Sequence, residues 1–212
     1  MPELGAEEMH TLQNDAVVEI FNIAVGQAAD TMSQMVHDEI LLSVPAVSFL
    51  TRGAAVERLG AEPLRRVCSV MQRFSGGIST DAILMFPEEK SLELVRLVIG
   101  EEMSLAEMTD LEQEAMSEIG NIVLNACMSG IADLFQVEFV SSLPRFQTGS
   151  VAEILGLEGG GGADDPVMLL FIDFRLQRHE IQGYVTFVLD IPAYDGFNER
   201  VARFVAGVVD GL

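Results

Sequence analysis

The sequence has few cysteines and no tryptophan: of its 212 residues only two, Cys68 and Cys127, are cysteine. Both lie within apolar stretches, "RVCSVM" and "LNACMS". Two cysteines in such surroundings form no disulfide framework, and disulfides are the rule in oxidising compartments. The sequence therefore favours a protein of the reducing cytoplasm.

Long apolar runs are also missing. No stretch reaches the roughly 18 apolar residues that a membrane-spanning helix needs. The first ten residues, MPELGAEEMH, lack the basic start and the apolar run of a secretory signal peptide. We therefore expect neither a membrane span nor secretion.

Positive charge is scarce. Twelve basic residues, of which only Lys90 is a lysine, stand against 33 acidic ones, and the net charge is −21. Such a chain is repelled by nucleic acid and by anionic lipid, so neither is expected as a partner. A protein with a basic surface, or with a positively charged group in its active site, is the expected kind of partner. The scarcity of lysine also fits a salt-adapted organism, which the sequence leaves open.

Hydrophobic periodicity predicts a mixture of helices and strands. Apolar residues at helical spacing, or in short runs of strand-forming residues, define each element. Helices are expected over 7–36, 88–99 and 110–135 and from 193, and strands over 38–51, 66–74, 78–86, 137–144, 167–177 and 181–191. Local signals predict a bend at Pro45, a hairpin turn at Gly76–Gly77 and a helix cap at Thr109–Asp110.

The order of one long helix, strands and a shorter helix occurs twice, which indicates an internal duplication. Three residues recur 99 positions later: Glu19 as Glu118, Asn22 as Asn121, and Pro45 as Pro144. We predict a single α+β domain over 1–212, made of two homologous halves at about 1–104 and 105–212. A pseudo-two-fold axis would join their strands into a central, mostly antiparallel sheet covered by the two long helices. A monomer would then suffice.

Later in the chain the offset between the halves grows to 105–106 residues. The glycine-rich segment EGGGGADD at 158–165 accounts for the insertion, and its consecutive glycines predict a flexible surface loop. A phosphate-binding loop is the alternative. It is disfavoured because no Gly-Lys-Ser/Thr follows and no helix is expected there.

Each long helix carries the same set of polar residues. Asp15, Glu19 and Asn22 occupy positions i, i+4 and i+7, which share one helix face. The second helix repeats the set as Glu114, Glu118 and Asn121. A solvated face alone would explain one such set, and a duplication could copy it without any function. The two halves have diverged widely elsewhere, however, and this favours a functional role.

The pattern Asp/Ser-x3-Glu-x2-Asn-x22-Pro resembles the signature of the CheC/CheX/FliY family of chemotaxis phosphatases. The first copy, from Asp15 to Pro45, fits it throughout. The second copy, from Glu114 to Pro144, departs only at its first residue, where the family has Asp or Ser. Two copies on a chain of this length are similar to the CheC branch, whereas CheX-type members carry one copy and dimerise.

The resemblance implies an enzyme that removes the phosphoryl group from the aspartate of a phosphorylated CheY-type response regulator. Each asparagine would orient the attacking water, as a glutamine does in GTPases. Each glutamate would pair with the regulator's active-site lysine. The implied catalytic residues are Glu19, Asn22, Glu118 and Asn121, and the implied partner-binding residues are Asp15 and Glu114.

The resemblance implies no metal or cofactor on this chain, because the response regulator brings its own divalent metal, such as Mg²⁺. His10, His37 and His179 also lack ligand-like partners at useful spacing. A non-catalytic adaptor that binds the receptor deamidase CheD, or phosphorylated CheY, is the alternative function. A flagellar-motor switch component is less favoured, because nothing after residue 192 is long enough for a switch domain.

Two glycines lie inside the predicted long helices, Gly26 and Gly120. Each costs about 1 kcal/mol relative to alanine in a helix. Gly120 adjoins Asn121, so it either clears space for a partner's backbone or packs closely against the sheet. The sequence leaves both possibilities open.

Overall fold

The computed structural model describes residues 6–36, 39–60, 66–76, 79–99, 105–176, 179–189 and 191–210. The elements in chain order are α1 (Ala6–Val36), β1 (Ile40–Thr51), α2 (Arg52–Leu59), β2 (Val67–Gly76), β3 (Thr80–Pro87), α3 (Glu88–Ile99), α4 (Leu105–Phe135), β4 (Phe139–Ser141), β5 (Arg145–Gly149), α5 (Val151–Ile154), β6 (Pro166–Leu176), β7 (His179–Leu189) and α6 (Ile191–Asp210). This confirms the predicted α+β class.

The described strands form one antiparallel sheet in the order β1-β6-β7-β3-β2-β4, and β5 also pairs with β2. β3 and β7 pair at the centre, β2 and β6 flank them, and β1 and the β4/β5 pair form the two edges. Each half thus places its first strand beside the hairpin of the other half. A duplication about a pseudo-two-fold axis predicts such an order, and the boundary between the halves stays a prediction.

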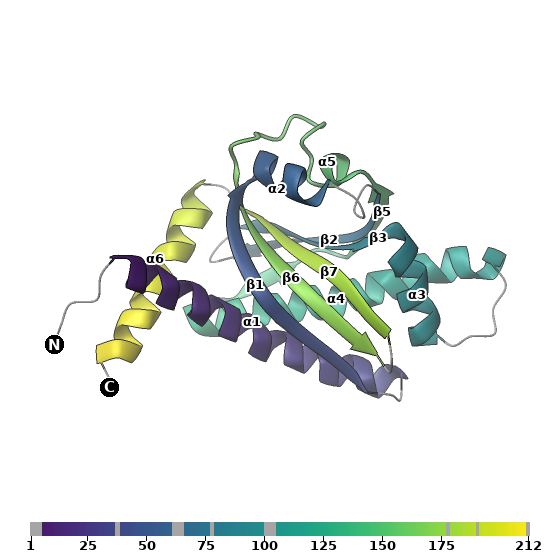
Figure 1. Cartoon of the computed structure of the whole chain (residues 1–212), viewed down its shortest axis with the longest axis horizontal. Helices are drawn as coiled ribbons and strands as arrows, with labels where there is room; N and C mark the ends of the chain where they lie inside the picture. The colour runs from purple at the N-terminus through teal and green to yellow at the C-terminus, as the bar shows by residue number, and fades with distance from the viewer. Residues whose placement is uncertain are drawn as a thin grey trace.

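The helices cover the two faces of the sheet unequally. Figure 1 shows α1 and α4 together against one face, and the short helices α2 and α5 over the other. The apolar stripe of α1 recurs every three or four residues and is fully buried; it comprises Val17, Phe21, Val25, Ala28 and Met32. Burial of each large side chain of this kind contributes about 1.5–3 kcal/mol. None of the described helices is long and apolar enough to cross a bilayer.

The predicted boundaries were wrong at the start of the second long helix. α4 begins at Leu105, so Thr109 and Asp110 lie inside it and do not cap it. A threonine or an aspartate inside a helix costs only about 0.7 kcal/mol or less relative to alanine. That cost is small beside the burial of the apolar stripe of α4. The sequence analysis also missed the short elements α2, β5 and α5, although Ser150 and Glu153 form a capping box, a local signal for the start of α5.

Both cysteines are buried free thiols. Burial raises the pKa of Cys68 to about 11, although a hydrogen bond from Ser91 opposes the shift. Burial likewise raises the pKa of Cys127 to about 12. The thiolate is the reactive form, so both residues are held in their inert state.

We predict that the folded chain reacts with Ellman's reagent at pH 8 at least about a hundredfold more slowly than the unfolded chain does. We also predict that the free energy of unfolding decreases as the pH rises from about 9 towards 11–12. In that range the unfolded chain has lost the thiol protons of Cys68 and Cys127 that the folded chain still holds. A Cys68→Ala, Cys127→Ala variant should lose this part of the pH dependence, and fast labelling of the folded chain would contradict the burial.

Candidate functional site

The first candidate site lies where the edge strand β1 runs beside α1. The register between β1 and β6 shifts between Ser43 and Ala46, so that Val44 and Pro45 together form a β-bulge. Proline has no N–H to donate, and it restricts the residue before it to extended conformations. The peptide groups of Val44 therefore lie outside the ladder and need other partners.

Asn22 of α1 supplies those partners. Its Oδ1 accepts a hydrogen bond of 2.8 Å from the N–H of Val44, and its Nδ2 donates to the carbonyl of Val44 at 3.0 Å. Nδ2 also donates to the carbonyl of Val18, at 3.0 Å. A backbone N–H can only donate, so the amide orientation of Asn22 is fixed by its partner. This two-point contact with the residue before Pro45 explains the spacing of the motif.

The carboxylates of the first set face solvent. Asp15 and Glu19 are exposed, and neither makes a hydrogen bond or ion pair with any described residue. Asn22 is half-buried. The amide of the first set is therefore partly buried, whereas its two carboxylates face solvent. Three residues advance a helix by about 300°, which turns Asn22 about 60° away from Glu19 and towards β1.

The second site repeats the carboxylates but not the asparagine's partners. Glu114 and Glu118 of α4 are exposed, and Asn121 is half-buried. Asn121 Oδ1 accepts two hydrogen bonds, of 3.1 Å from Gln72 Nε2 and of 2.9 Å from Asn125 Nδ2. Asn121 Nδ2 makes no hydrogen bond to any residue that the structure describes.

Backbone carbonyls also fix the orientation of these amides. Gln72 Nε2 donates to the carbonyl of Ser142 at 3.1 Å, and Asn125 Nδ2 donates to the carbonyl of Asn121 at 2.7 Å. A carbonyl only accepts, so both nitrogens are identified and Asn121 must turn its oxygen towards them. Gln72 lies on β2 and is 1% exposed, so the group is anchored in the core.

The two sites lie far apart in the sheet order. β1 and the β4/β5 pair are the opposite edges, so each Glu–Asn pair stands at its own edge and no composite site forms. The sequences of α1 and α4, 31 residues each, contain no lysine or arginine. Each site is therefore a rigid, acidic helix surface with an amide at its flank.

Comparison with known proteins matches the segment that carries the first of these sites. A protein-family model described as the CheC-like family matches residues 12–49, which include the whole of the first motif. The chain is 22% identical over 192 residues to the CheY-P phosphatase CheC of Bacillus subtilis (strain 168), covering 88% of this chain and 91% of that protein. The chain is therefore similar to CheC-like proteins, and the match to the family model falls on the segment that carries the first motif.

Two further proteins are similar to this chain over most of its length. The flagellar motor switch phosphatase FliY of Bacillus subtilis (strain 168) is 21% identical over 183 residues. That match covers 85% of this chain but only 46% of FliY, so this chain spans about half the length of that relative. The crystal structure of Thermotoga maritima FliY matches with a TM-score of 0.71 at 15% identity, covering 96% of this chain and 100% of that one.

Sequence reasoning missed three parts of these two sites. It predicted no role for Asn125, for Gln72 or for the backbone of Val44. Gln72 carried a signal, because it is a polar residue at a position that shares a strand face with the core residues Val70 and Phe74. Buried amides are hydrogen-bonded, so such a residue predicts a polar partner on the helix above it.

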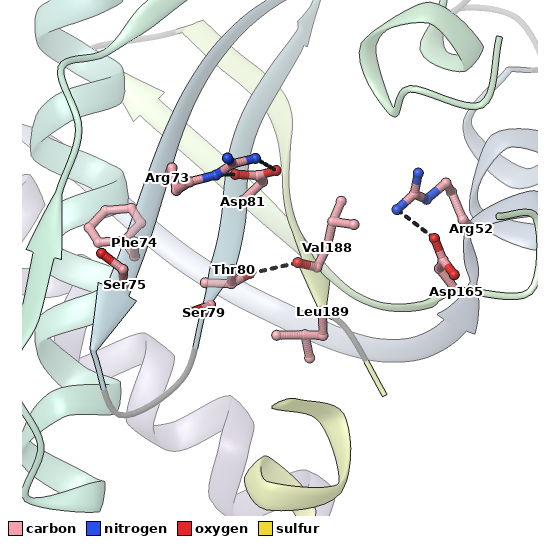
Figure 2. A pocket seen from close by; sticks show the side chains of 10 residues that line it. All are labelled: Arg52, Arg73, Phe74, Ser75, Ser79, Thr80, Asp81, Asp165, Val188 and Leu189. Atoms are coloured by element: carbon pink, nitrogen blue, oxygen red, sulfur yellow. Dashed lines mark hydrogen bonds and ion pairs between the residues drawn. The ribbon is translucent and has the colours of Figure 1, made fainter. Parts of the chain in front are cut away.

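A separate hollow of about 620 Å³ lies near the ends of β2, β3 and β7 and the start of α2. Figure 2 shows that Arg73 points to Asp81 and Arg52 to Asp165. The closest nitrogen–oxygen distances in these two ion pairs are 2.7 and 2.9 Å. Both guanidinium groups are thus already paired, and no residue of either motif lines this hollow.

No group of three or more His, Cys, Asp and Glu side chains that could hold a metal occurs among the described residues. The side chains of His10, His37 and His179 lie outside that part of the chain. The expectation that this chain carries no metal therefore stays a prediction.

Proposed function

We propose that the chain accelerates hydrolysis of the aspartyl phosphate of a CheY-type response regulator. One observation carries the proposal. At each edge of the sheet a rigid helix presents an exposed glutamate, with no partner among the described residues, one turn before a half-buried asparagine. The activity in the name of the Bacillus subtilis relative, CheY-P phosphatase, supports it.

The proposed chemistry asks little of the chain. An aspartyl phosphate is already labile, and a response regulator brings its own divalent metal, such as Mg²⁺, and a lysine to neutralise the phosphoryl oxygens. What remains is to hold one water in line with the leaving carboxylate. An asparagine oxygen accepts a hydrogen bond from that water, whereas a neutral amide cannot act as a base. The asparagine of such a site therefore acts by orientation.

Docking is the proposed role of Glu19 and Glu118. Each carboxylate is exposed and makes no ion pair with a described residue, so neither has an internal bond to break before it binds a lysine. A charge-assisted hydrogen bond, shielded at an interface, contributes about 1.5–3 kcal/mol. The absence of lysine and arginine from α1 and α4 adds a favourable field for such a lysine.

The test is phosphate release from a phosphorylated, Mg²⁺-loaded CheY-type receiver, with and without the chain. We predict that a Glu19→Gln, Glu118→Gln variant raises the KM for the receiver about 10- to 100-fold, which corresponds to the loss of about 1.5–3 kcal/mol. Its free energy of unfolding should change by less than about 0.5 kcal/mol, because both side chains are exposed. Rising salt concentration should raise the KM of the unmodified chain.

Glu57→Gln is the matched control. Glu57 is an exposed glutamate on α2, on the other face of the sheet, so its replacement should leave both KM and stability as they are. If phosphate release from the receiver is no faster with the unmodified chain than without it, the proposed enzymatic function is refuted. If that chain nevertheless bound the phosphorylated receiver, or CheD, in a fixed ratio, the adaptor function would replace it.

The proposed enzyme acts as a monomer in the cytoplasm. Each half supplies its own Glu–Asn pair on one helix, so no second chain is needed to complete a site.

A further inference from the structure

We infer that the two halves are not equivalent, and that Asn22 is the working catalytic asparagine. Gln72 and Asn125 are positioning residues: they hold Asn121 so that its oxygen cannot receive the attacking water. This inference rests on the proposed function and assigns different tasks to its two sites.

The hydrogen-bond inventory of the two asparagines carries the inference. An amide oxygen has two lone pairs. Among the described residues, Asn22 Oδ1 accepts only from the N–H of Val44, so one lone pair is left for water. Asn121 Oδ1 accepts from both Gln72 and Asn125, and neither lone pair is left. The oxygen that must orient the water is therefore available in the first half and occupied in the second.

The difference comes from residues that the first half lacks. Gly26 lies 99 positions before Asn125, and it has no side chain to donate a hydrogen bond. Ile172 of β6 lies opposite the bulge of β1, just as Gln72 of β2 lies opposite the segment before Pro144. Unlike Gln72, Ile172 is apolar, and it is fully buried. Neither Gly26 nor Ile172 can occupy the oxygen of the asparagine beside it.

A third difference sets the distance between helix and sheet. Phe21, next to Asn22, is fully buried and stacks on Phe187 of β7 at a ring distance of 5.7 Å. Its counterpart 99 positions later is Gly120, and a Cβ there would lie 2.4 Å from Val70 Cγ1. α4 therefore approaches β2 more closely than any side chain would allow. This close approach brings Asn121 and Asn125 within hydrogen-bonding distance of Gln72.

The sites at the two edges of the sheet therefore have different tasks. Asn121 Nδ2 makes no hydrogen bond to a described residue, so it can donate to a phosphoryl oxygen, while Glu118 stays exposed for a lysine. The second half can thus bind a phosphorylated receiver without orienting its water. The first half can do both once the receiver delivers the water to the open lone pair of Asn22.

The experiment removes one donor from the second site while the first site is disabled. In the Asn22→Ala background, Asn125→Ala leaves Asn121 Oδ1 with one donor, the same number that Asn22 has. We expect this change to raise the kcat of phosphate release from a phosphorylated receiver at least about fivefold over Asn22→Ala alone, with KM within about twofold. Asn125→Leu keeps the volume but not the donor, and should act in the same way.

The same change in an Asn22→Ala, Asn121→Ala background is the control and should restore nothing. A gain with Asn125→Ala but not with Asn125→Leu would indicate a packing effect and overturn the inference. So would no gain in kcat from either variant while both bind the receiver and keep their melting temperature. If the unmodified chain does not accelerate phosphate release at all, the proposed function and this inference are both refuted.

Discussion

Replacing Asn22 with alanine should lower the maximal rate of stimulated dephosphorylation at least about tenfold, and replacing Asn22 and Asn121 together should abolish the stimulation. The reason is the loss of the amide oxygen that holds the attacking water. An effect on orientation lowers kcat, whereas the glutamate variants act on KM. Single-turnover and steady-state measurements with one phosphorylated receiver separate the two.

The Asn22 variant also has a cost in stability that must be measured beside its activity. Asn22 satisfies the N–H and the carbonyl of Val44, which is 1% exposed. Leaving such groups unpaired costs about 1–3 kcal/mol. Rates should therefore be compared at a temperature at which every variant is folded. Gln27→Ala, an exposed position on the same helix, is the control that should keep both activity and stability. An Asn22→Ala variant with full kcat would refute the catalytic role.

Gly120→Ala should destabilise the fold by about 2–3 kcal/mol, even though alanine is the better helix former by about 1 kcal/mol. The added Cβ would lie 2.4 and 2.5 Å from the Cγ1 and Cβ atoms of Val70, which is itself fully buried. Val70 Cβ is attached to the strand backbone and cannot swing away, so α4 has to move from β2. In a chain of this size the melting temperature should fall by about 4–12 °C.

Gly26→Ala is the matched comparison. A Cβ at Gly26 meets nothing within 4 Å, so the helix propensity of alanine should raise stability by about 0.5–1 kcal/mol. A double-mutant cycle of Gly120→Ala with Val70→Ala should show that the smaller partner recovers at least about 1 kcal/mol of the loss. Equal effects of alanine at Gly26 and Gly120 would contradict the close approach of α4 to β2.

The two glycines show what helix patterns can and cannot predict. From the sequence both were glycines inside a helix, and Gly120 had two possible roles. The structure decides that Gly120 packs against the sheet, because Val70 lies directly beneath it. Gly26 has no such neighbour. Sequence spacing places residues on a helix face. The distance from that face to the strand beneath it depends on the other side chains of both elements.

The sequence by itself determined the α+β class, the two long helices, the repeated motif and the exposed position of Glu19 and Glu118. These features depend on periodicity and on spacing within one helix, which are local properties of the chain. Only the tertiary structure decided the partners of the two asparagines, because Val44 and Gln72 reach them through strand register and through the closeness of helix and sheet. The same helical motif therefore occurs twice, and the strand beneath each copy determines which hydrogen bonds its asparagine makes.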